Sequence, residues 1–376
     1  MRFSFSDEQQ EFRSVLRRFL QDRSPTTEVR RLMATEEGRD AEVWQGLSRD
    51  LGLTGIHIPE AYGGQGFGIS ELAIAVEEMG RALLCAPYFA STVLAATVIL
   101  KVGSDAQKKA LLPNIAAGQT IAAFAFTEEN GRWDVGGVAT TATRAGDKYR
   151  LDGVKSFVLD GHSANLIVVL ARRPGTEAAD GLSLFVVRED AAGLQRRRLA
   201  TADETRKLAR LAFSGVEAEL LGEDGSAGAS LSETLDIAAI CLANEMVGGA
   251  ERLRESAVEF ANMRVQFGRP IASFQSLKHK AADMLLDVEL AKSAAYYAAA
   301  AADEGDEDLP ALASLAKVAA SEAYMQTAIH TVQIHGGIGF TWDNDTQLWF
   351  KRAKSSEVFL GGPAYHRERL MQLWNV

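Results

Sequence analysis

Apolar residues recur with a helical period through the first third of the chain. Ser6 and Gln9 form a capping-box pair, and Phe12 and Leu16 follow on one face of the same helix. Comparable apolar stripes, separated by glycine-containing turns, continue to the end of this third. The pattern predicts an N-terminal helical domain over residues 1–119.

The periodicity changes at Thr120 to short alternating or β-branched runs, separated by turn pairs such as Gly146-Asp147. Short strands at this spacing favour an antiparallel β-sandwich or barrel, and we predict a middle β domain over residues 120–226. No Gly-x-Gly-x-x-Gly pattern follows a strand and opens a helix, so a Rossmann nucleotide site is not supported. The runs lie at 138–144, 148–151, 166–170, 182–187 and 208–213.

Long helical patterns return at Ala227 and continue to the end of the chain. Four long helices with short connections predict a four-helix bundle, in a C-terminal domain over residues 227–376. The expected fold class is therefore multidomain α and β, with an N-terminal helical domain, a middle β domain and a C-terminal bundle. The helical patterns run from Leu231 to Met263, from Phe274 to Asp303, from Leu312 to Ile334 and from Asp345 onward.

The chain is acidic, with 40 basic and 50 acidic residues, which argues against a nucleic-acid-binding protein because that class needs a basic face. No apolar run of about 18 residues lacks charges, so no membrane span is expected. No secretory segment opens the chain, and the expected location is the cytoplasm. Cys85 and Cys241 lie in apolar runs as expected for reduced core residues, and no metal-ligand spacing occurs, so no metal site is expected.

One turn between two long helical patterns gathers three chemically distinct side chains. Pro270 ends the first helix, and the turn places Arg264, Phe267 and Gln275 near one another. Arginine offers a bidentate fork that suits a pyrophosphate, glutamine a donor and an acceptor, and phenylalanine a flat face. A helix hairpin with solvated charges is the alternative, but it does not explain why these three residue types meet at one turn.

A glycine-rich stretch follows the third long helix. Gln333 to Phe340 contains Gly336, Gly337 and Gly339, which permit positive φ and expose backbone N–H groups to a ligand. A helix C-cap followed by a turn is the alternative. The turn around Arg264 favours the ligand cradle, because it supplies the other half of a binding site.

Four motifs combine with the predicted domain order. They are RxxFGxPIxxFQxxKH, QIHGGIGF, PEAYGGQG and FAFTEE, which start at Arg264, Gln333, Pro59 and Phe124. Over essentially the whole chain, they resemble the acyl-CoA dehydrogenase family. The resemblance implies a tetrameric flavoprotein of lipid β-oxidation, with FAD bound between the middle and C-terminal domains and completed across a dimer interface. It also implies oxidation of the α,β-bond of an acyl-CoA, with electrons passed to an electron-transfer flavoprotein.

The resemblance assigns FAD contacts residue by residue. Phe157 stands where the family has tryptophan and keeps a stacking face, whereas Leu159 replaces a hydroxyl residue that bonds the flavin edge. The implied contacts are Phe124, Phe126, Thr127, Phe157, Val158 and Leu159 in the middle domain, and Arg264, Phe267, Gln275, Gln333, His335, Gly336 and Gly337 in the C-terminal domain. Of these, Gln333, Gly336 and Gly337 match the backbone cradle that the family supplies from the neighbouring subunit.

Two departures from the family concern the reaction itself. Most members end the bundle with Tyr-Glu-Gly-Thr, whose glutamate is the base, and Leu360 occupies that position here. Some members carry the glutamate on the first bundle helix, where this chain has Ala238. Neither side chain can abstract a proton. In addition, Asn130–Asp134 replaces a Gly-Ser element that contacts the thioester ligand.

Glu245 is the candidate for a relocated base, because it lies on a largely apolar stripe of the first bundle helix. The alternative is a buried ion pair between Glu245 and Arg252 or another cation. Asp236 is a weaker candidate for the base, expected near the helix start and solvated. Glu128 is expected to be structural, and His366 is expected at the surface.

Three functions remain open. The first is an active FAD-dependent acyl-CoA dehydrogenase, in a homo-oligomer, with a relocated base. The second is a non-catalytic FAD-binding partner in a heterotetramer, as in the heteromeric sterol side-chain acyl-CoA dehydrogenases that the chain resembles around Pro363–Glu368. The third is a flavin oxidase or monooxygenase on the same fold. The intact RxxFG and QxHGGxG motifs argue against a further class, a flavin-free scaffold or binding subunit. Gly248 and Gly249 either leave room for a bulky acyl group or mark close helix packing.

Overall fold

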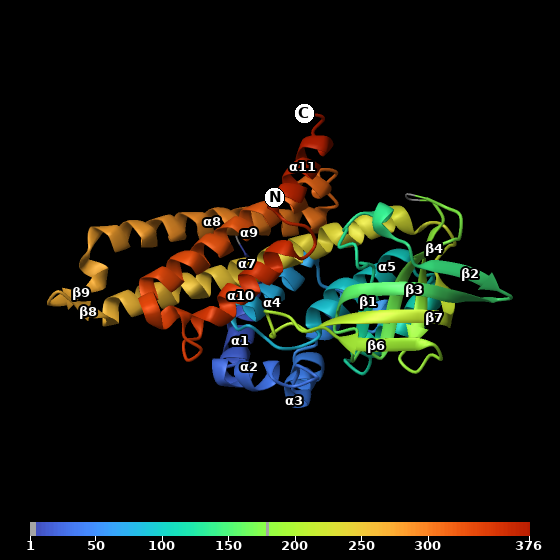
Figure 1. The fold of residues 1–376 in the computed structure, drawn as a ribbon, viewed down its shortest axis with the longest axis horizontal. Coiled ribbons are helices and arrows are strands. Elements are labelled where there is room, and N and C mark those ends of the chain that lie inside the picture. The colour runs from blue at the N-terminus through green and yellow to red at the C-terminus, as the bar shows by residue number, and fades with distance from the viewer. Residues whose placement is uncertain (1–4, 178–179) are drawn as a thin grey trace. The chain divides into compact units, whose positions relative to one another are not determined.

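The computed structural model describes residues 5–177 and 180–376, in two compact units (Figure 1). The helical, β and helical order along the chain is as predicted. The boundaries predicted at 119/120 and 226/227 both fall inside the second unit and stay predictions. The first unit comprises Met1–Arg31, Ile69–Leu84 and Asp236–Val376, and the second comprises Leu32–Gly68 and Cys85–Leu235.

Long helices build the first unit. The predicted capping box forms, with Ser6 Oγ accepting from the Gln9 N–H at 3.2 Å. Gly305 ends α8 in the left-handed conformation, and α9 then packs against α8, α10 and α11. Of the described helices, none is long and apolar enough to cross a lipid bilayer. The helices are α1 (Asp7–Arg23), α2 (Thr26–Met33), α4 (Ile69–Arg81), α7 (Ala227–Met263), α8 (Gln275–Glu304), α9 (Leu309–His335), α10 (Thr346–Val358) and α11 (Pro363–Leu373).

Glycines let the helices of this unit approach closely. A Cβ on Gly248 of α7 would lie 1.9 Å from the carbonyl oxygen of Glu77 on α4. A Cβ on Gly249 would lie 2.4 Å from the hydroxyl oxygen of Tyr324 on α9. Both glycines therefore mark close helix packing, and neither leaves room for an acyl group.

We expect Gly248→Ala to lower the free energy of unfolding by about 3 kcal/mol or more, because the new methyl overlaps a backbone carbonyl and the two helices must separate. Urea denaturation followed by circular dichroism measures the loss. Gly362→Ala is the matched control, since its Cβ would meet its nearest atom at 3.9 Å. Equal stability of the two variants would contradict the close crossing of α4 and α7.

A strand ring closes the β region of the second unit. β4 pairs with β2, β2 with β3, β3 with β7, β7 with β5, and β5 returns to β4. The strands are β1 (Ala122–Ala125), β2 (Thr141–Ala145), β3 (Lys148–Leu159), β4 (Leu166–Arg172), β5 (Leu182–Arg188), β6 (Leu194–Arg198) and β7 (Leu208–Leu221). The architecture agrees with the predicted barrel.

Two pairings depart from the purely antiparallel sheet that was predicted. β1 runs parallel to β4 over four residue pairs, and β2 meets β4 in parallel at Thr141 and Arg172. The remaining ladders of the ring are antiparallel. Parallel neighbours need a long crossover between them, and β2 and β3 lie between β1 and β4 in the sequence. Turn residues alone reveal only hairpins, so the sequence pattern missed these pairings.

Helices of the second unit cover part of this region. β1 packs against the π-helical segment Phe89–Ala96. His57 is buried beside it, with Nε2 at 3.1 Å from Thr97 Oγ1, and burial lowers the pKa of His57 to about 4. Cys85 and Cys241 are both buried, as predicted. The remaining segments of this unit are α3 (Ala41–Gln45), α5 (Thr97–Val102), α6 (Asp105–Ala116), the π-helical Gly46–Asp50, and the 3₁₀ turns Leu53–Gly55, Glu60–Tyr62 and Val135–Gly137.

Candidate functional site

A small apolar cluster joins the two motifs that were predicted to form one site. Ile334 of α9 belongs to a cluster with Ala261 of α7 and Met284 of α8, and Ile271 packs against it. The ring of His335 stacks on Phe260, with centroids 4.2 Å apart. The turn around Arg264 and the glycine-rich stretch therefore lie at the same end of α7, α8 and α9.

A two-stranded hairpin forms the turn between α7 and α8. β8 (Val265–Gln266) and β9 (Arg269–Pro270) flank Phe267 and Gly268, whose φ values of 54° and 76° fit a type I′ turn. Phe267 is 91% exposed, and a bulky residue at positive φ is strained. Arg264 and Gln275 are exposed as well. The hairpin and the residues that flank it therefore expose the ring of Phe267, the guanidinium of Arg264 and the amide of Gln275 to solvent.

The glycine-rich stretch presents open backbone. Gly336 has φ 63° and ψ −142°, a combination that only glycine adopts without strain. A Cβ on Gly336 or Gly337 would meet nothing within 4 Å, whereas one on Gly339 would lie 2.9 Å from the carbonyl oxygen of Val332. Gln333 is exposed and accepts from Lys280 Nζ at 3.2 Å. Accessible backbone at the same end of the helices as the Arg264 guanidinium fits the diphosphate of a dinucleotide such as FAD.

His335 lies in the interior of the same stretch. Its Nδ1 is 2.8 Å from the carbonyl oxygen of Thr331, and its ring stacks on Phe260. Burial lowers the pKa of His335. The imidazole therefore supports the end of α9 from inside.

The six predicted contacts of the middle domain fall into two groups. Phe157 is 41% exposed at φ 60°, where a bulge interrupts the pairing of β3 with β7. Thr127 is buried, and its hydroxyl donates to the carbonyl oxygen of Ser156 at 2.6 Å. The bulge therefore turns one aromatic ring outward while its neighbours stay in the core. The other buried members are Phe124, Phe126, Val158 and Leu159.

Glu128 has a structural role, as predicted. Its Oε1 accepts from Lys155 Nζ at 2.8 Å, and its two oxygens accept from the N–H groups of Ala139 and Thr140. Burial acts to raise the pKa of Glu128, but Lys155 and the two N–H groups outweigh burial and hold that pKa below its usual value. Burial lowers the pKa of Lys155 to about 8.

Glu245 is buried in an ion pair. Its Oε1 lies 3.1 Å from Nη1 of Arg352 on α10, and both side chains are less than 9% exposed. Arg252, the partner considered from sequence, instead faces Glu255 and Glu259. A carboxylate held by a guanidinium is less available to take a proton.

Asp236 is also paired, and its predicted solvation is wrong. It is buried, and its Oδ1 and Oδ2 accept from Arg369 at 2.5 and 2.9 Å. Arg369 lies on α11, which packs on α9 and brings the guanidinium to the start of the bundle. Both carboxylates of α7 that were considered as bases are thus held by arginines.

The segment that contains Leu360 is held from the bundle side. Leu360 is buried at φ 61°, and its carbonyl oxygen lies 2.9 Å from His366 Nε2. The buried Lys317 donates to the carbonyl oxygens of Ser356, Glu357 and Gly361 at 3.0 to 3.1 Å. The backbone around Leu360 is therefore held by His366 and Lys317.

His366 is 2% exposed, so its predicted surface position is wrong. α11 begins at Pro363 and turns the imidazole toward Ser314 Oγ, at 3.3 Å from Nδ1. Burial, together with the positive charge of Lys317, lowers the pKa of His366 to about 4. A neutral imidazole can donate from Nε2 to the Leu360 carbonyl and accept at Nδ1.

We expect the free energy of unfolding to fall between pH 7 and pH 5. His57 and His366 have folded pKa values of about 4 against an ordinary 6.5, so the unfolded chain binds their protons first as the pH falls. The contribution of these two histidines to the free energy of unfolding is fully present above pH 6.5 and is lost as the pH falls toward 4. At pH 5 the loss is about 2 kcal/mol per histidine. Urea midpoints at the two pH values, for wild type and the His57→Gln/His366→Gln variant, measure this term. The exposed His279→Gln serves as control, and an identical pH dependence in all three proteins would contradict the assignment.

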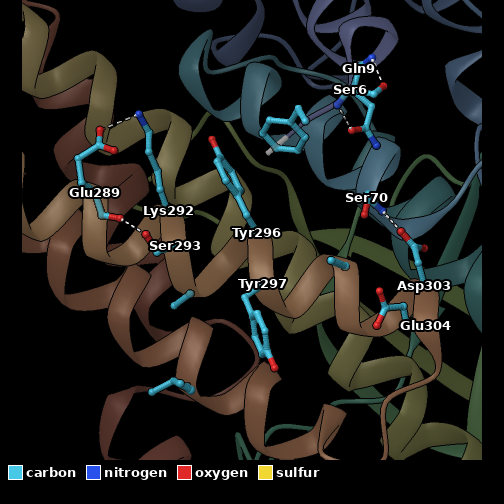
Figure 2. Close-up of a pocket in the computed structure, with 14 residues that line it drawn as sticks. Ser6, Gln9, Ser70, Glu289, Lys292, Ser293, Tyr296, Tyr297, Asp303 and Glu304 are labelled. Atoms are coloured by element: carbon cyan, nitrogen blue, oxygen red, sulfur yellow. Dashed lines mark hydrogen bonds and ion pairs between the residues drawn. The ribbon is translucent and has the colours of Figure 1, made fainter. Parts of the chain in front are cut away.

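A cavity of about 840 Å³ lies elsewhere in the first unit, along α8 (Figure 2). None of the predicted FAD contacts lines it. Several of its polar groups are already bonded to one another: the Ser70 N–H to Asp303, Lys292 to Glu289, and the Ser293 hydroxyl to the Glu289 carbonyl oxygen. A cavity with such bonded walls offers few convergent groups to a ligand.

Three family models match most of the chain. They are the acyl-CoA dehydrogenase N-terminal domain over residues 6–119, the middle domain over 123–216 and the C-terminal domain over 228–373. The chain is 32% identical to acyl-CoA dehydrogenase IpdE2 of Mycobacterium tuberculosis, with 98% of each chain covered.

Two solved structures share the whole architecture. Butyryl-CoA dehydrogenase of Megasphaera elsdenii is 29% identical, with a TM-score of 0.93 and 100% of each chain covered. The steroid ACAD Tcur3481-Tcur3483 is 31% identical, with a TM-score of 0.88 and 98% of each chain covered. The predicted fold class is confirmed.

Proposed function

This chain belongs to the acyl-CoA dehydrogenase family, and on that premise we propose that it is the FAD-binding subunit of a heteromeric acyl-CoA dehydrogenase whose catalytic carboxylate comes from a related subunit. Members of the family are FAD-binding oxidoreductases that dehydrogenate acyl-CoA thioesters. FAD, when bound, supplies the acceptor for two electrons.

This chain's contribution is to bind and orient the cofactor. In the first unit, Arg264 would meet an FAD diphosphate and the backbone of Gly336 and Gly337 would border one. In the second unit, the exposed ring of Phe157 would face a flavin. Phe267 and Gln275 would hold the adenosine end. A guanidinium fork, an amide and open glycine backbone are the donors that such a dinucleotide requires.

The missing base carries the proposal. The α-proton of a thioester is weakly acidic and needs a carboxylate shielded from water. Leu360 occupies the position where most of the family has that carboxylate, and its side chain is buried and cannot take a proton. Glu245 and Asp236 are each held by an arginine. Proton abstraction is therefore assigned to a partner subunit.

One similar structure supports this assignment. The steroid ACAD Tcur3481-Tcur3483 bears two protein names, which suits an assembly of two different subunits. We take from it the substrate class, an acyl-CoA thioester with a steroid-derived acyl group. We propose an electron-transfer flavoprotein as the electron acceptor, following the family.

Purification of the chain alone and with a related subunit that carries glutamate at the Leu360 position tests the proposal. Alone, the chain should bind FAD. The absorbance of the oxidised flavin near 450 nm should persist when acyl-CoAs are added without oxygen, because no electrons reach the flavin. The co-expressed complex should bleach with a steroid-derived acyl-CoA.

Three outcomes would contradict this function. Bleaching of the chain alone would show that it carries its own base. Rapid oxygen consumption would place it among the flavin oxidases. Absence of bound FAD in both preparations would contradict the proposal that this chain binds FAD.

A further inference from the structure

One arginine of α2 holds the segment that follows the glycine-rich stretch. Arg30 Nε donates to Asp345 Oδ1 at 2.8 Å, and its Nη2 donates to the carbonyl oxygens of Trp342 at 2.7 Å and Asn344 at 3.3 Å. The guanidinium also lies 5.4 Å from the centre of the Trp342 ring. A single side chain thus contacts three residues within four positions.

This segment is fixed at both ends but has little apolar anchoring between them. At one end His335 stacks on Phe260, and at the other Asn344 Oδ1 accepts from the N–H of Thr346 at 2.9 Å. Between the ends, Phe340 is 82% exposed and Ile338 and Trp342 are more than half exposed. Exposed apolar side chains contribute little burial energy, so polar contacts hold this backbone. Besides those of Arg30, Gln347 Nε2 donates to the Trp342 carbonyl oxygen at 3.2 Å, and Thr346 Oγ1 donates to that of Gly339 at 3.5 Å.

We propose that Arg30 is a positioning residue for FAD, which holds residues 342–345 so that the backbone of Gly336 and Gly337 is ordered before the cofactor arrives. The inference rests on the proposed role of these two glycines. When a binding loop is ordered in only a fraction of the molecules, the apparent affinity for the ligand is the intrinsic affinity multiplied by that fraction. Arg30 would therefore act on FAD affinity without touching the cofactor.

The contacts require arginine in particular. Its planar fork reaches a carboxylate and two carbonyl oxygens at once, whereas a lysine ammonium is a single point charge on a flexible stem. Lys351 offers an internal comparison, because its Nζ lies 4.9 Å from the same Trp342 ring. Arg30→Lys and Lys351→Met therefore separate backbone anchoring from attraction to the ring.

The test measures FAD affinity and loop exchange on the full chain in its complex. We expect Arg30→Gln and Arg30→Lys to raise the dissociation constant of FAD about tenfold or more, while Lys351→Met and the exposed Arg18→Gln stay near wild type. Hydrogen–deuterium exchange of residues 336–345 should accelerate in the Arg30 variants without FAD, with α8 unchanged. Saturating FAD should restore turnover, because only the affinity is lowered.

A second pair of variants keeps the outcomes distinct. Gly336→Ala probes the proposed FAD contact itself, and Asp345→Asn weakens the Arg30 anchor without altering α2. If Gly336→Ala loses FAD while the Arg30 and Asp345 variants bind FAD like wild type with unchanged exchange, the positioning role is wrong and the site stands. If Gly336→Ala also binds FAD normally, this stretch is not the FAD site and both assignments fail. Should Arg30→Gln unfold, the Asp345→Asn affinity and exchange decide.

Discussion

Leu360→Glu is expected to raise the anaerobic rate of flavin bleaching by acyl-CoA in the isolated chain by about 10²- to 10⁴-fold, the usual contribution of a positioned general base. The variant restores a carboxylate where the family carries its base. The surrounding backbone is already held by His366 and Lys317, so the new side chain starts from an ordered position. Stopped-flow absorbance at 450 nm without oxygen measures the rate.

Leu360→Gln is the matched control for that gain. The amide has the size and shape of the carboxylate but cannot take a proton, so its bleaching rate should equal that of wild type. Thermal unfolding of the three proteins checks that the buried polar group is tolerated. Equal rates for the glutamate and glutamine variants would contradict the assignment of position 360 to the reacting site.

Arg352→Ala is expected to lower the free energy of unfolding by about 3–5 kcal/mol, because it leaves Glu245 buried without its guanidinium. The two side chains are less than 9% exposed, so solvent replaces little of the lost interaction. Urea denaturation at pH 7 gives the difference from wild type.

The double variant Glu245→Leu/Arg352→Met tests the structural role of the pair. Two apolar side chains replace the buried charges, so its stability should return to within about 1 kcal/mol of wild type. The coupling between the two sites follows from the double-mutant cycle. In the reconstituted complex, Glu245→Gln should retain turnover. Lost turnover with unchanged stability would instead identify Glu245 as the base.

Much of the FAD half of the site could be predicted from sequence. Arg264 and Gln275 are eleven residues apart across a proline-ended turn, so local geometry alone brings them together. The run of glycines by itself predicts a positive φ, and Gly336 has one. The sequence did not reveal that Phe157 is the one predicted FAD contact of the middle domain that is exposed, because the bulge that exposes it depends on the pairing of β3 with β7.

The partners of buried charges could not be predicted. Arg352 meets Glu245 from 107 positions away, and Arg369 meets Asp236 from 133. His366 was expected at the surface because Pro363–Glu368 is locally polar, and only the packing of α11 on α9 places it inside. Arg30 gave no sequence signal either, since its acceptors at residues 342–345 include two backbone carbonyls.

The sequence by itself determined the order of helical and β regions, the two cofactor motifs and the absence of a base at Leu360, because each depends on residue type and local spacing. The tertiary structure decided which carboxylates are neutralised, which strands run parallel and what holds the glycine-rich stretch. Those features depend on contacts between residues far apart in sequence, and hydrophobic periodicity orients a helix toward the core without choosing its charged neighbours.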